Sequence, residues 1–216
     1  MNKYELKVIK TRVKLTFSTD ILGSTPKNKE VYASFIKARA EESAKKSGKQ
    51  TDDELETVQE TEERGWTGFH ADDEGLLIYD YVVRGLLKEA ATALQSTHGV
   101  QAIKSKIDKY VFVGPRRIHI LRDGRPIKEP DGICERPLRA MTMQGPRVTL
   151  ARSDMVSAGK GQVTLEFDIT ILPNESKKGD GVTLDLVKFL LSYGQYQGMG
   201  QWRNASNGRF TVEFMD

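Results

Sequence analysis

Hydrophobic and polar residues alternate most regularly between residues 162 and 172. Five apolar residues share one face of the extended chain there, and threonines and acids share the other: Val163, Leu165, Phe167, Ile169 and Ile171. This period of two predicts a strand with one buried face. Other stretches of the same kind predict strands at 4–17, 76–79, 110–113, 118–121, 147–151 and 210–214.

A period close to four marks the helices. In residues 80–95, Val82, Leu86 and Ala90 step along one face, which predicts an amphipathic helix packed on the core. The apolar run 182–191 predicts a second helix. A shorter helix is expected after Asn28, which can cap it.

Most predicted strands follow one another without a helix between them. A parallel doubly wound sheet would need a helix after nearly every strand. The order of elements therefore predicts an α+β fold with a largely antiparallel sheet. We also expect loops at 127–134 and 152–161, and a turn at 72–75.

One stretch differs in composition from the rest. Residues 40–65 are polar and hold few large apolar side chains, so we expect one domain, 1–216, with a charged, mobile insertion at about 41–65. Between residues 41 and 75 there are 12 acids and 4 bases, a net of −8, whereas the whole chain carries +3. The remainder carries +11, which suits a polyanionic partner.

Composition limits the class of protein. The chain of 216 residues is 38% hydrophobic and 29% charged, as in soluble globular proteins. No apolar run approaches the roughly 20 residues of a membrane span, and residues 1–10 lack a signal-peptide core. Cys134 is the single cysteine, which fits a reducing compartment. We therefore expect a cytoplasmic protein without membrane contact.

The residue types that commonly carry catalysis are scattered. His70, His98 and His119 lie far apart in sequence with no local partner pattern, and no cluster has metal-ligand spacing. We expect no catalytic residue, metal or cofactor. The alternative is a metal-dependent nuclease that uses Asp72, Asp73 or Glu74, although no calcium-loop pattern follows them.

The stretch 193–214 carries the strongest candidate site. Its glycines allow positive φ and the close approach of a phosphate, and amide groups beside guanidinium groups favour anions. Trp202 offers a base a stacking surface. The alternative is a mobile turn without a ligand. The spacing of Gly198 and Gly200 fits neither a Walker loop nor a dinucleotide motif.

Basic residues complete the candidate surface. Arginine predominates in the second half of the chain, and its planar group suits phosphate contact and base stacking. Arg84 and Lys88 share one side of the helix predicted at 80–95, where an ordinary solvated face is the alternative. The predicted nucleic-acid-binding residues are Arg84, Lys88, Arg116, Arg117, Arg147, Arg152, Gly198, Gly200, Trp202, Arg203, Gly208 and Arg209.

Three stretches resemble the RAMP superfamily, the RNA-binding subunits and processing nucleases of CRISPR systems. Gly198-Met-Gly200, a gap of seven residues and Gly208-Arg-Phe210 resemble its glycine-rich loop between a helix and a strand. YVVRGLLKEA at 81–90 resembles a helix start of its backbone subunits, with Gly85 and Lys88 at the matching positions. The first strand running into ILGSTP at 21–26 resembles the family's opening strand and loop.

The resemblance implies a ferredoxin-like (RRM-like) core with insertions. It also implies a non-catalytic protein that binds single-stranded RNA or DNA, with RNA favoured. Such a protein would act beside other subunits of a CRISPR-type ribonucleoprotein, and several copies of it could assemble along the nucleic-acid strand. The processing nucleases keep a histidine early in the chain, whereas the first one here is His70. Asp20 lies near the place of the aspartate of target-cutting subunits, but its surroundings do not match. Cleavage is therefore not inferred.

A second interpretation is a protein-interaction module of phage or mobile-element origin, for example an inhibitor of a CRISPR complex. The acidic insertion, which the family does not predict, would then be the contact surface. Deletion of residues 42–63 separates the two interpretations, because it would abolish partner binding and spare RNA binding.

Overall fold

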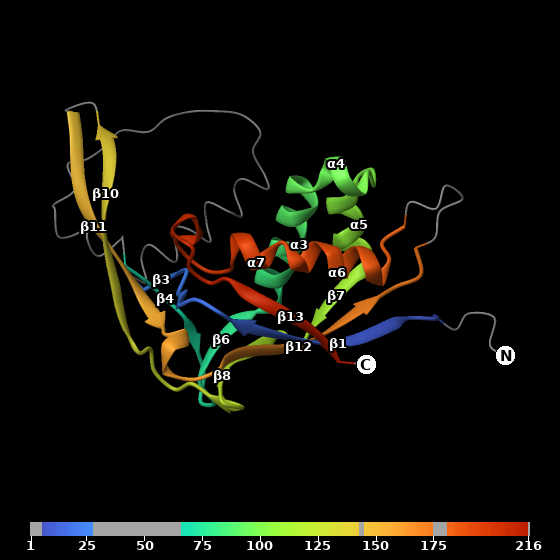
Figure 1. Cartoon of the computed structure of the whole chain (residues 1–216), viewed down its shortest axis with the longest axis horizontal. Coiled ribbons are helices and arrows are strands. Elements are labelled where there is room, and N and C mark those ends of the chain that lie inside the picture. The colour runs from blue at the N-terminus through green and yellow to red at the C-terminus, as the bar shows by residue number, and fades with distance from the viewer. Residues whose placement is uncertain (1–5, 28–65, 143–144, 175–180, 216) are drawn as a thin grey trace. The chain divides into compact units, whose positions relative to one another are not determined.

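The computed structural model describes residues 6–27, 66–142, 145–174 and 181–215, without the side chains of 138–149 (Figure 1). The helix predicted after Asn28 and the insertion predicted at about 41–65 lie outside these residues. The chain divides into two compact units, one of residues 1–21, 70–129 and 157–216, the other of 22–69 and 130–156. The single RAMP-like domain stays a prediction.

The first unit is built on an antiparallel sheet in the order β13–β1–β12–β8–β6–β5. Its long central strands are β1 (Ile9–Phe17) and β12 (Val163–Ile171). The flanking strands are β13 (Phe210–Met215), β8 (Arg117–Arg122), β6 (Leu76–Tyr79) and β5 (His70–Ala71). Two short strands extend it: β7 (Val111–Gly114) pairs with β12, and β9 (Arg125–Pro126) pairs with β8.

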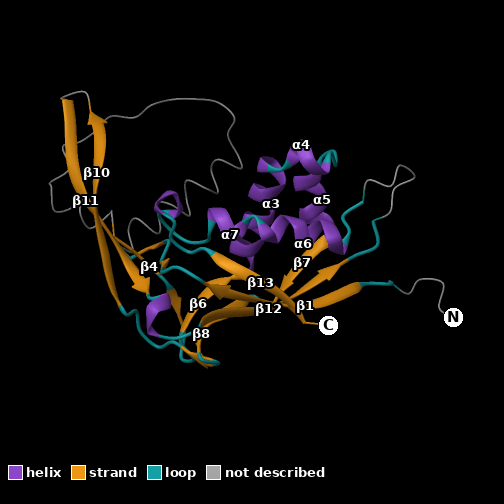
Figure 2. Cartoon of the chain, viewed as in Figure 1, coloured by secondary structure: helices purple, strands orange, loops and turns teal. Residues whose placement is uncertain are grey.

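Helices cover one face of this sheet (Figure 2). They are α3 (Asp80–Ala93), α4 (Gln95–His98), α5 (Ile103–Tyr110), α6 (Leu184–Ser192) and α7 (Gly194–Gln197). The described residues also form two 3₁₀ turns, η1 (Ala158–Lys160) and η2 (Arg203–Ala205). Along the chain, the main elements follow in the order β1, α3, β7–β8, β12, α6 and β13. Within the sheet, the central strands lie in the order β13–β1–β12–β8. Together these two orders fit a ferredoxin-like core with insertions. The predicted α+β class with a mostly antiparallel sheet is confirmed.

The core follows from the alternation in the sequence. Val13, Leu15 and Phe17 of β1 are buried beside the apolar face of β12. The helices close this layer with buried residues of α3 and α6: Val83, Leu86, Leu87, Val187, Leu190 and Leu191. Burial of each such side chain contributes about 1.5–3 kcal/mol of transfer free energy, which fixes which face of each element turns inward.

The second unit holds a separate sheet in the order β10–β11–β4–β3. Its strands are β3 (Thr25–Pro26), β4 (Trp66–Gly68), β10 (Gly132–Thr142) and β11 (Gly145–Val156). The short β2 (Ile21–Leu22), where the chain passes from the first unit into the second, pairs with β11. β10 and β11 form a long antiparallel hairpin.

This hairpin corrects two predicted loops. Residues 132–134 belong to β10, and residues 152–156 belong to β11. The end of β11 looks like a loop in sequence because Ser153 and Asp154 are polar, yet both are buried. Ser153 Oγ lies 2.8 Å from Thr67 Oγ1, and Asp154 accepts from Lys27 at 2.8 Å. Buried hydrogen bonds therefore replace apolar contacts in this strand.

Among the described helices, none has the length and apolar character that crossing a membrane requires.

Candidate nucleic-acid interface

The exposed face of α3 gathers several of the predicted residues. Its other face is anchored in the core by Val83, Leu86 and Leu87. A helix with this apolar stripe turns the remaining positions outward, and these carry Tyr81, Arg84, Gly85 and Lys88. Arg84 and Lys88 thus lie on one side of a helix, as their spacing predicts.

Aromatic rings cluster where β6 passes into α3. The ring of Tyr79 stacks on that of Tyr81, with centroids 5.6 Å apart and planes at 18°. His70 packs edge-on against Tyr79 at 4.6 Å. The guanidinium carbon of Arg116 lies 5.9 Å from the centre of the Tyr79 ring. Stacked rings beside an arginine provide a surface for bases and a cation for phosphate.

This cluster is held by the backbone of the sheet. Tyr79 lies opposite Arg117 across β6 and β8, and His70 lies opposite Leu77 across β5 and β6. The amide of Asp80 donates to the carbonyl oxygen of Arg116 at 3.0 Å. Tyr81 is 48% exposed, and Arg116 is exposed. The surface is therefore fixed in position yet accessible.

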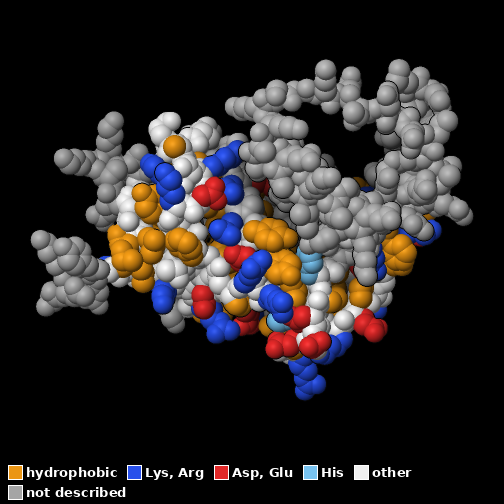
Figure 3. All heavy atoms as spheres, turned by 180° about the vertical axis from the view of Figure 1, so that it is seen from behind, with side chains coloured by type: hydrophobic (Ala, Val, Ile, Leu, Met, Phe, Trp, Pro, Cys, Tyr) orange, Lys and Arg blue, Asp and Glu red, His pale blue; other side chains and the backbone are white. Residues whose placement is uncertain are grey.

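Most predicted cations around α3 already have a carboxylate partner. Arg84 contacts Asp80 at 3.1 Å, Lys88 contacts Asp108 at 2.8 Å, and Arg203 of the glycine-rich loop contacts Glu89 at 2.7 Å. On the face drawn in Figure 3, blue and red side chains are interspersed over the described part of the chain. A phosphate would have to compete with a carboxylate at each of these three cations.

Arg116 differs from these cations. Within the described ranges, no carboxylate lies within ion-pair distance of its guanidinium group, which lies beside the Tyr79 ring. A phosphate can therefore reach the charge of Arg116 without displacing an acid.

A hollow of about 500 Å³ lies between α3 and α5. Its lining includes Gly85, Lys88 and Thr92 of α3 and Lys104 of α5. A Cβ atom added at Gly85 would meet no atom within 4 Å. The helix surface there is open, so the backbone of a ligand can approach it.

The glycine-rich loop is a compact element bonded to its surroundings. Met199 N–H donates to the Gly208 carbonyl at 2.8 Å, and Gly208 N–H donates to the Asp20 carbonyl at 2.7 Å. Arg209 N–H donates to Thr19 Oγ1 at 2.9 Å. The anion-binding role predicted for the loop backbone therefore does not extend to these amides, since each already has a protein acceptor.

The glycines of the loop allow two backbone segments to lie close together. Gly208 has φ +70°, and a Cβ there would lie 1.8 Å from the Met199 carbonyl oxygen. Gly198 has φ +75°, and a Cβ there would lie 2.4 Å from the Asn207 carbonyl oxygen. Gly200 also has positive φ, at 94°. The predicted backbone freedom is real, and at Gly198 and Gly208 the fold itself requires it.

The side chains of the loop differ in accessibility. Trp202 is 40% exposed, whereas Arg209 is half-buried. Arg203 reaches across to α3 through Glu89, which also accepts from Gln197 at 3.3 Å. The loop thus contributes Trp202 and Arg203 to the neighbourhood of α3.

Three other predicted residues are placed elsewhere. Arg117 contacts Asp72 at 3.4 Å on the same sheet as Tyr79. Arg152 and Arg147 belong to β11 of the second unit, where Arg152 contacts Glu135 at 2.9 Å and Arg147 lies opposite Ala140.

The acidic turn considered for metal binding has a structural use. Asp72 Oδ1 accepts from the amides of Glu74 and Gly75 and lies 2.9 Å from His119 Nε2. The hydrogen bond with His119 lowers the pKa of Asp72. In the described part of the chain, no group of three or more His, Cys, Asp or Glu residues is arranged to hold a metal ion. Asp20 likewise accepts from Ser157 and from the Ala158 amide.

Sequence reasoning missed the aromatic part of the surface. Tyr79, Tyr81 and His70 were not among the predicted binding residues. The signal was the pair of tyrosines that flanks Asp80, at the junction of a predicted strand and a predicted helix. The pairing of β5 with β6, which places His70 beside Tyr79, has no such sequence signal.

Comparison with known proteins identifies no family. No protein-family model matches the sequence, and no curated protein matches it. Among solved structures, the chain is similar to one described as a Type IV-B CRISPR Complex, with a TM-score of 0.45 and 10% identity over 96% of this chain and 90% of that chain. A likeness at this TM-score adds no argument about function.

Proposed function

We propose that this protein is a non-catalytic, RAMP-like subunit of a CRISPR-type ribonucleoprotein that binds single-stranded nucleic acid, with RNA favoured. The observation that carries the binding is the stack of Tyr79 on Tyr81 beside Arg116. Stacking of a base on an aromatic side chain is worth about 1–3 kcal/mol and tolerates any base.

The exposed face of α3 extends this surface. Arg84 and Lys88 follow Tyr81 along the helix, and the hollow at Gly85 leaves room beside them. Phosphate contacts of this kind position a strand without reading its sequence. Because the cations are half-exposed and paired, their exchange from carboxylate to phosphate gives a salt-dependent affinity.

The assembly part of the proposal rests on the sequence resemblance. The stretches at 21–26, 81–90 and 198–210 resemble the RAMP superfamily, and a ferredoxin-like core is the fold which that resemblance implies.

Fluorescence anisotropy with a labelled single-stranded RNA and the equivalent DNA tests the proposal. Across a salt series, the affinity should fall as salt rises, with a preference for RNA. Absence of binding to either strand at low salt contradicts the proposal. Equal binding of a double-stranded competitor would contradict the stacking model, because paired bases offer no free faces.

A further inference from the structure

We propose a second ligand site, for a nucleoside phosphate, in the hollow formed by residues 122–129 at the turn between β8 and β9. The hollow measures about 520 Å³ and lies wholly within the first unit. Small-molecule sites commonly occupy about 300–1,000 Å³. The site goes beyond the proposed function, since none of its residues belongs to the surface of α3.

The walls of the hollow are held in place by backbone hydrogen bonds. Asp123 N–H donates to the Gln162 carbonyl at 3.0 Å, and Gln162 N–H donates back to Asp123 Oδ1 at 3.0 Å. Ile127 N–H donates to the Ile120 carbonyl at 2.9 Å, and its own carbonyl accepts from Leu76 at 2.7 Å. The site is therefore formed before any ligand enters, which lowers the cost of ordering on binding.

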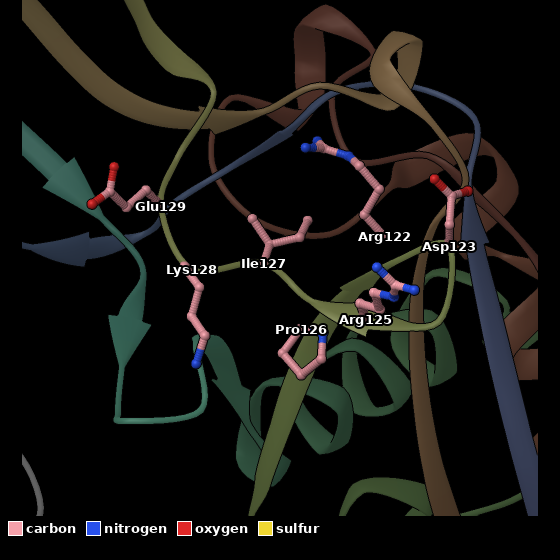
Figure 4. Close-up of a pocket in the computed structure, with 7 residues that line it drawn as sticks. All are labelled: Arg122, Asp123, Arg125, Pro126, Ile127, Lys128 and Glu129. Carbon is pink, nitrogen blue, oxygen red and sulfur yellow. The ribbon is translucent and has the colours of Figure 1, made fainter.

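The charge of the lining favours an anion. Arg122, Arg125 and Lys128 supply three cations against the carboxylates of Asp123 and Glu129, a net of +1. Figure 4 shows Ile127 between Arg122 and Arg125 on one side and Lys128 and Glu129 on the other. Cations on two sides of a hollow attract one phosphate group and restrict where it sits.

These cations are oriented differently from those around α3. Lys128 Nζ donates to the Asp73 carbonyl at 2.7 Å. A carbonyl oxygen positions this cation without cancelling its charge, whereas the partners of Arg84, Lys88 and Arg203 are carboxylates. In the described part of the chain, neither Arg125 nor Lys128 lies within ion-pair distance of a carboxylate.

The apolar part of the hollow narrows the ligand class. Pro126 is exposed and Ile127 is buried to 7% exposure, so the floor between the cations is apolar. A phosphate alone would leave this floor uncovered, whereas a sugar or base attached to the phosphate covers it. The chemistry is thus that of a nucleoside phosphate, either free or at the end of a strand.

Calorimetry with adenosine monophosphate, and anisotropy with a short single-stranded RNA that carries a 5′-phosphate or a 5′-hydroxyl, test the site. Arg125→Ala and the charge reversal Arg125→Glu are the test variants, because Arg125 is exposed and we expect its loss to leave the fold intact. Arg12→Ala is the matched control, since Arg12 is an exposed arginine whose partner is Glu166, outside the hollow.

We expect Arg125→Ala to weaken adenosine monophosphate binding at least about tenfold, or to remove the preference for phosphate-ended RNA. Arg125→Glu should show a larger loss of affinity than Arg125→Ala, and Arg12→Ala should bind both probes like the wild type. Nucleotide binding identifies a free ligand, whereas a phosphate-end preference alone identifies a strand end. Wild-type affinity of the variants for both probes, or no binding of either probe to the wild type, overturns the site. Failure of the α3 surface instead shows as binding of adenosine monophosphate or of 5′-phosphate RNA without binding of 5′-hydroxyl RNA.

Discussion

Tyr79 and Tyr81 stack at 5.6 Å although a single residue separates them. In a continuous strand, side chains two residues apart stand about 7 Å from one another. Asp80 starts α3 between them, and the change from strand to helix brings the second ring onto the first. Since the sheet already holds Tyr79, the surface needs little ordering before a base binds.

Arg203 and Glu89 give the first prediction. Glu89→Gln keeps the shape of the side chain and removes the charge that Arg203 contacts at 2.7 Å, so Arg203 becomes available to phosphate. We expect RNA affinity to rise a few-fold in Glu89→Gln, and to fall about three- to tenfold in Arg203→Ala or Trp202→Ala. Anisotropy at fixed salt measures both changes.

The melting temperature is the control for this pair. Both side chains are partly exposed, at 29% and 37%, so the ion pair contributes only about 0–1 kcal/mol to stability. If Glu89→Gln weakens RNA binding as much as Arg203→Ala does, the pair is a tether that shapes the loop and not a competitor of phosphate.

Two glycines predict opposite effects on stability. Gly208→Ala places a Cβ against the Met199 carbonyl at positive φ and should cost on the order of 2–4 kcal/mol. Gly85→Ala meets open space on the exposed side of α3 and should stabilise the protein by roughly 0.5–1 kcal/mol. Urea unfolding of both variants tests this. A neutral Gly208→Ala would show that the loop adjusts, contrary to its hydrogen bonding.

His70 predicts a dependence of stability on pH. Burial lowers the pKa of His70 below its ordinary value of 6.5. As the pH falls, the His70 imidazole is protonated in the unfolded state before it is protonated in the folded state. The stability present above pH 6.5 is therefore lost as the pH falls through the folded-state pKa of His70. The unfolding free energy of the wild type should therefore decline more steeply than that of His70→Gln between about pH 7 and pH 5. Parallel curves for the two proteins would contradict this account.

The sequence predicted the parts of the fold that follow from periodicity. The alternation in 162–172 matches β12, and the four-residue step in 80–95 matches α3. It failed at 152–156, because a strand whose polar residues are buried looks like a loop. Helix α5 was also not predicted, since it is only eight residues long and rich in lysine.

The candidate site was predicted less completely than the fold. Arg84 and Lys88 were placed correctly on one side of a helix, because helical spacing is local. The carboxylate partners of Lys88 and Arg203 were not predicted from the sequence. Asp108 lies 20 residues from Lys88 along the chain, and Glu89 lies 114 residues from Arg203. The contact of Arg116 with Tyr79 depends on sheet pairing in the same way.

The most direct test of the central claim is the affinity of Tyr81→Ala and Arg116→Ala for single-stranded RNA by anisotropy. Phe112→Ala and Arg12→Ala are the matched controls, because both residues are exposed and lie outside the aromatic cluster and the glycine-rich loop. The account predicts that Tyr81→Ala binds about 5- to 100-fold more weakly, Arg116→Ala less so but with a shallower salt dependence, and that both controls bind like the wild type. Equal affinity of Tyr81→Ala and Phe112→Ala, with melting temperatures unchanged, would contradict the account.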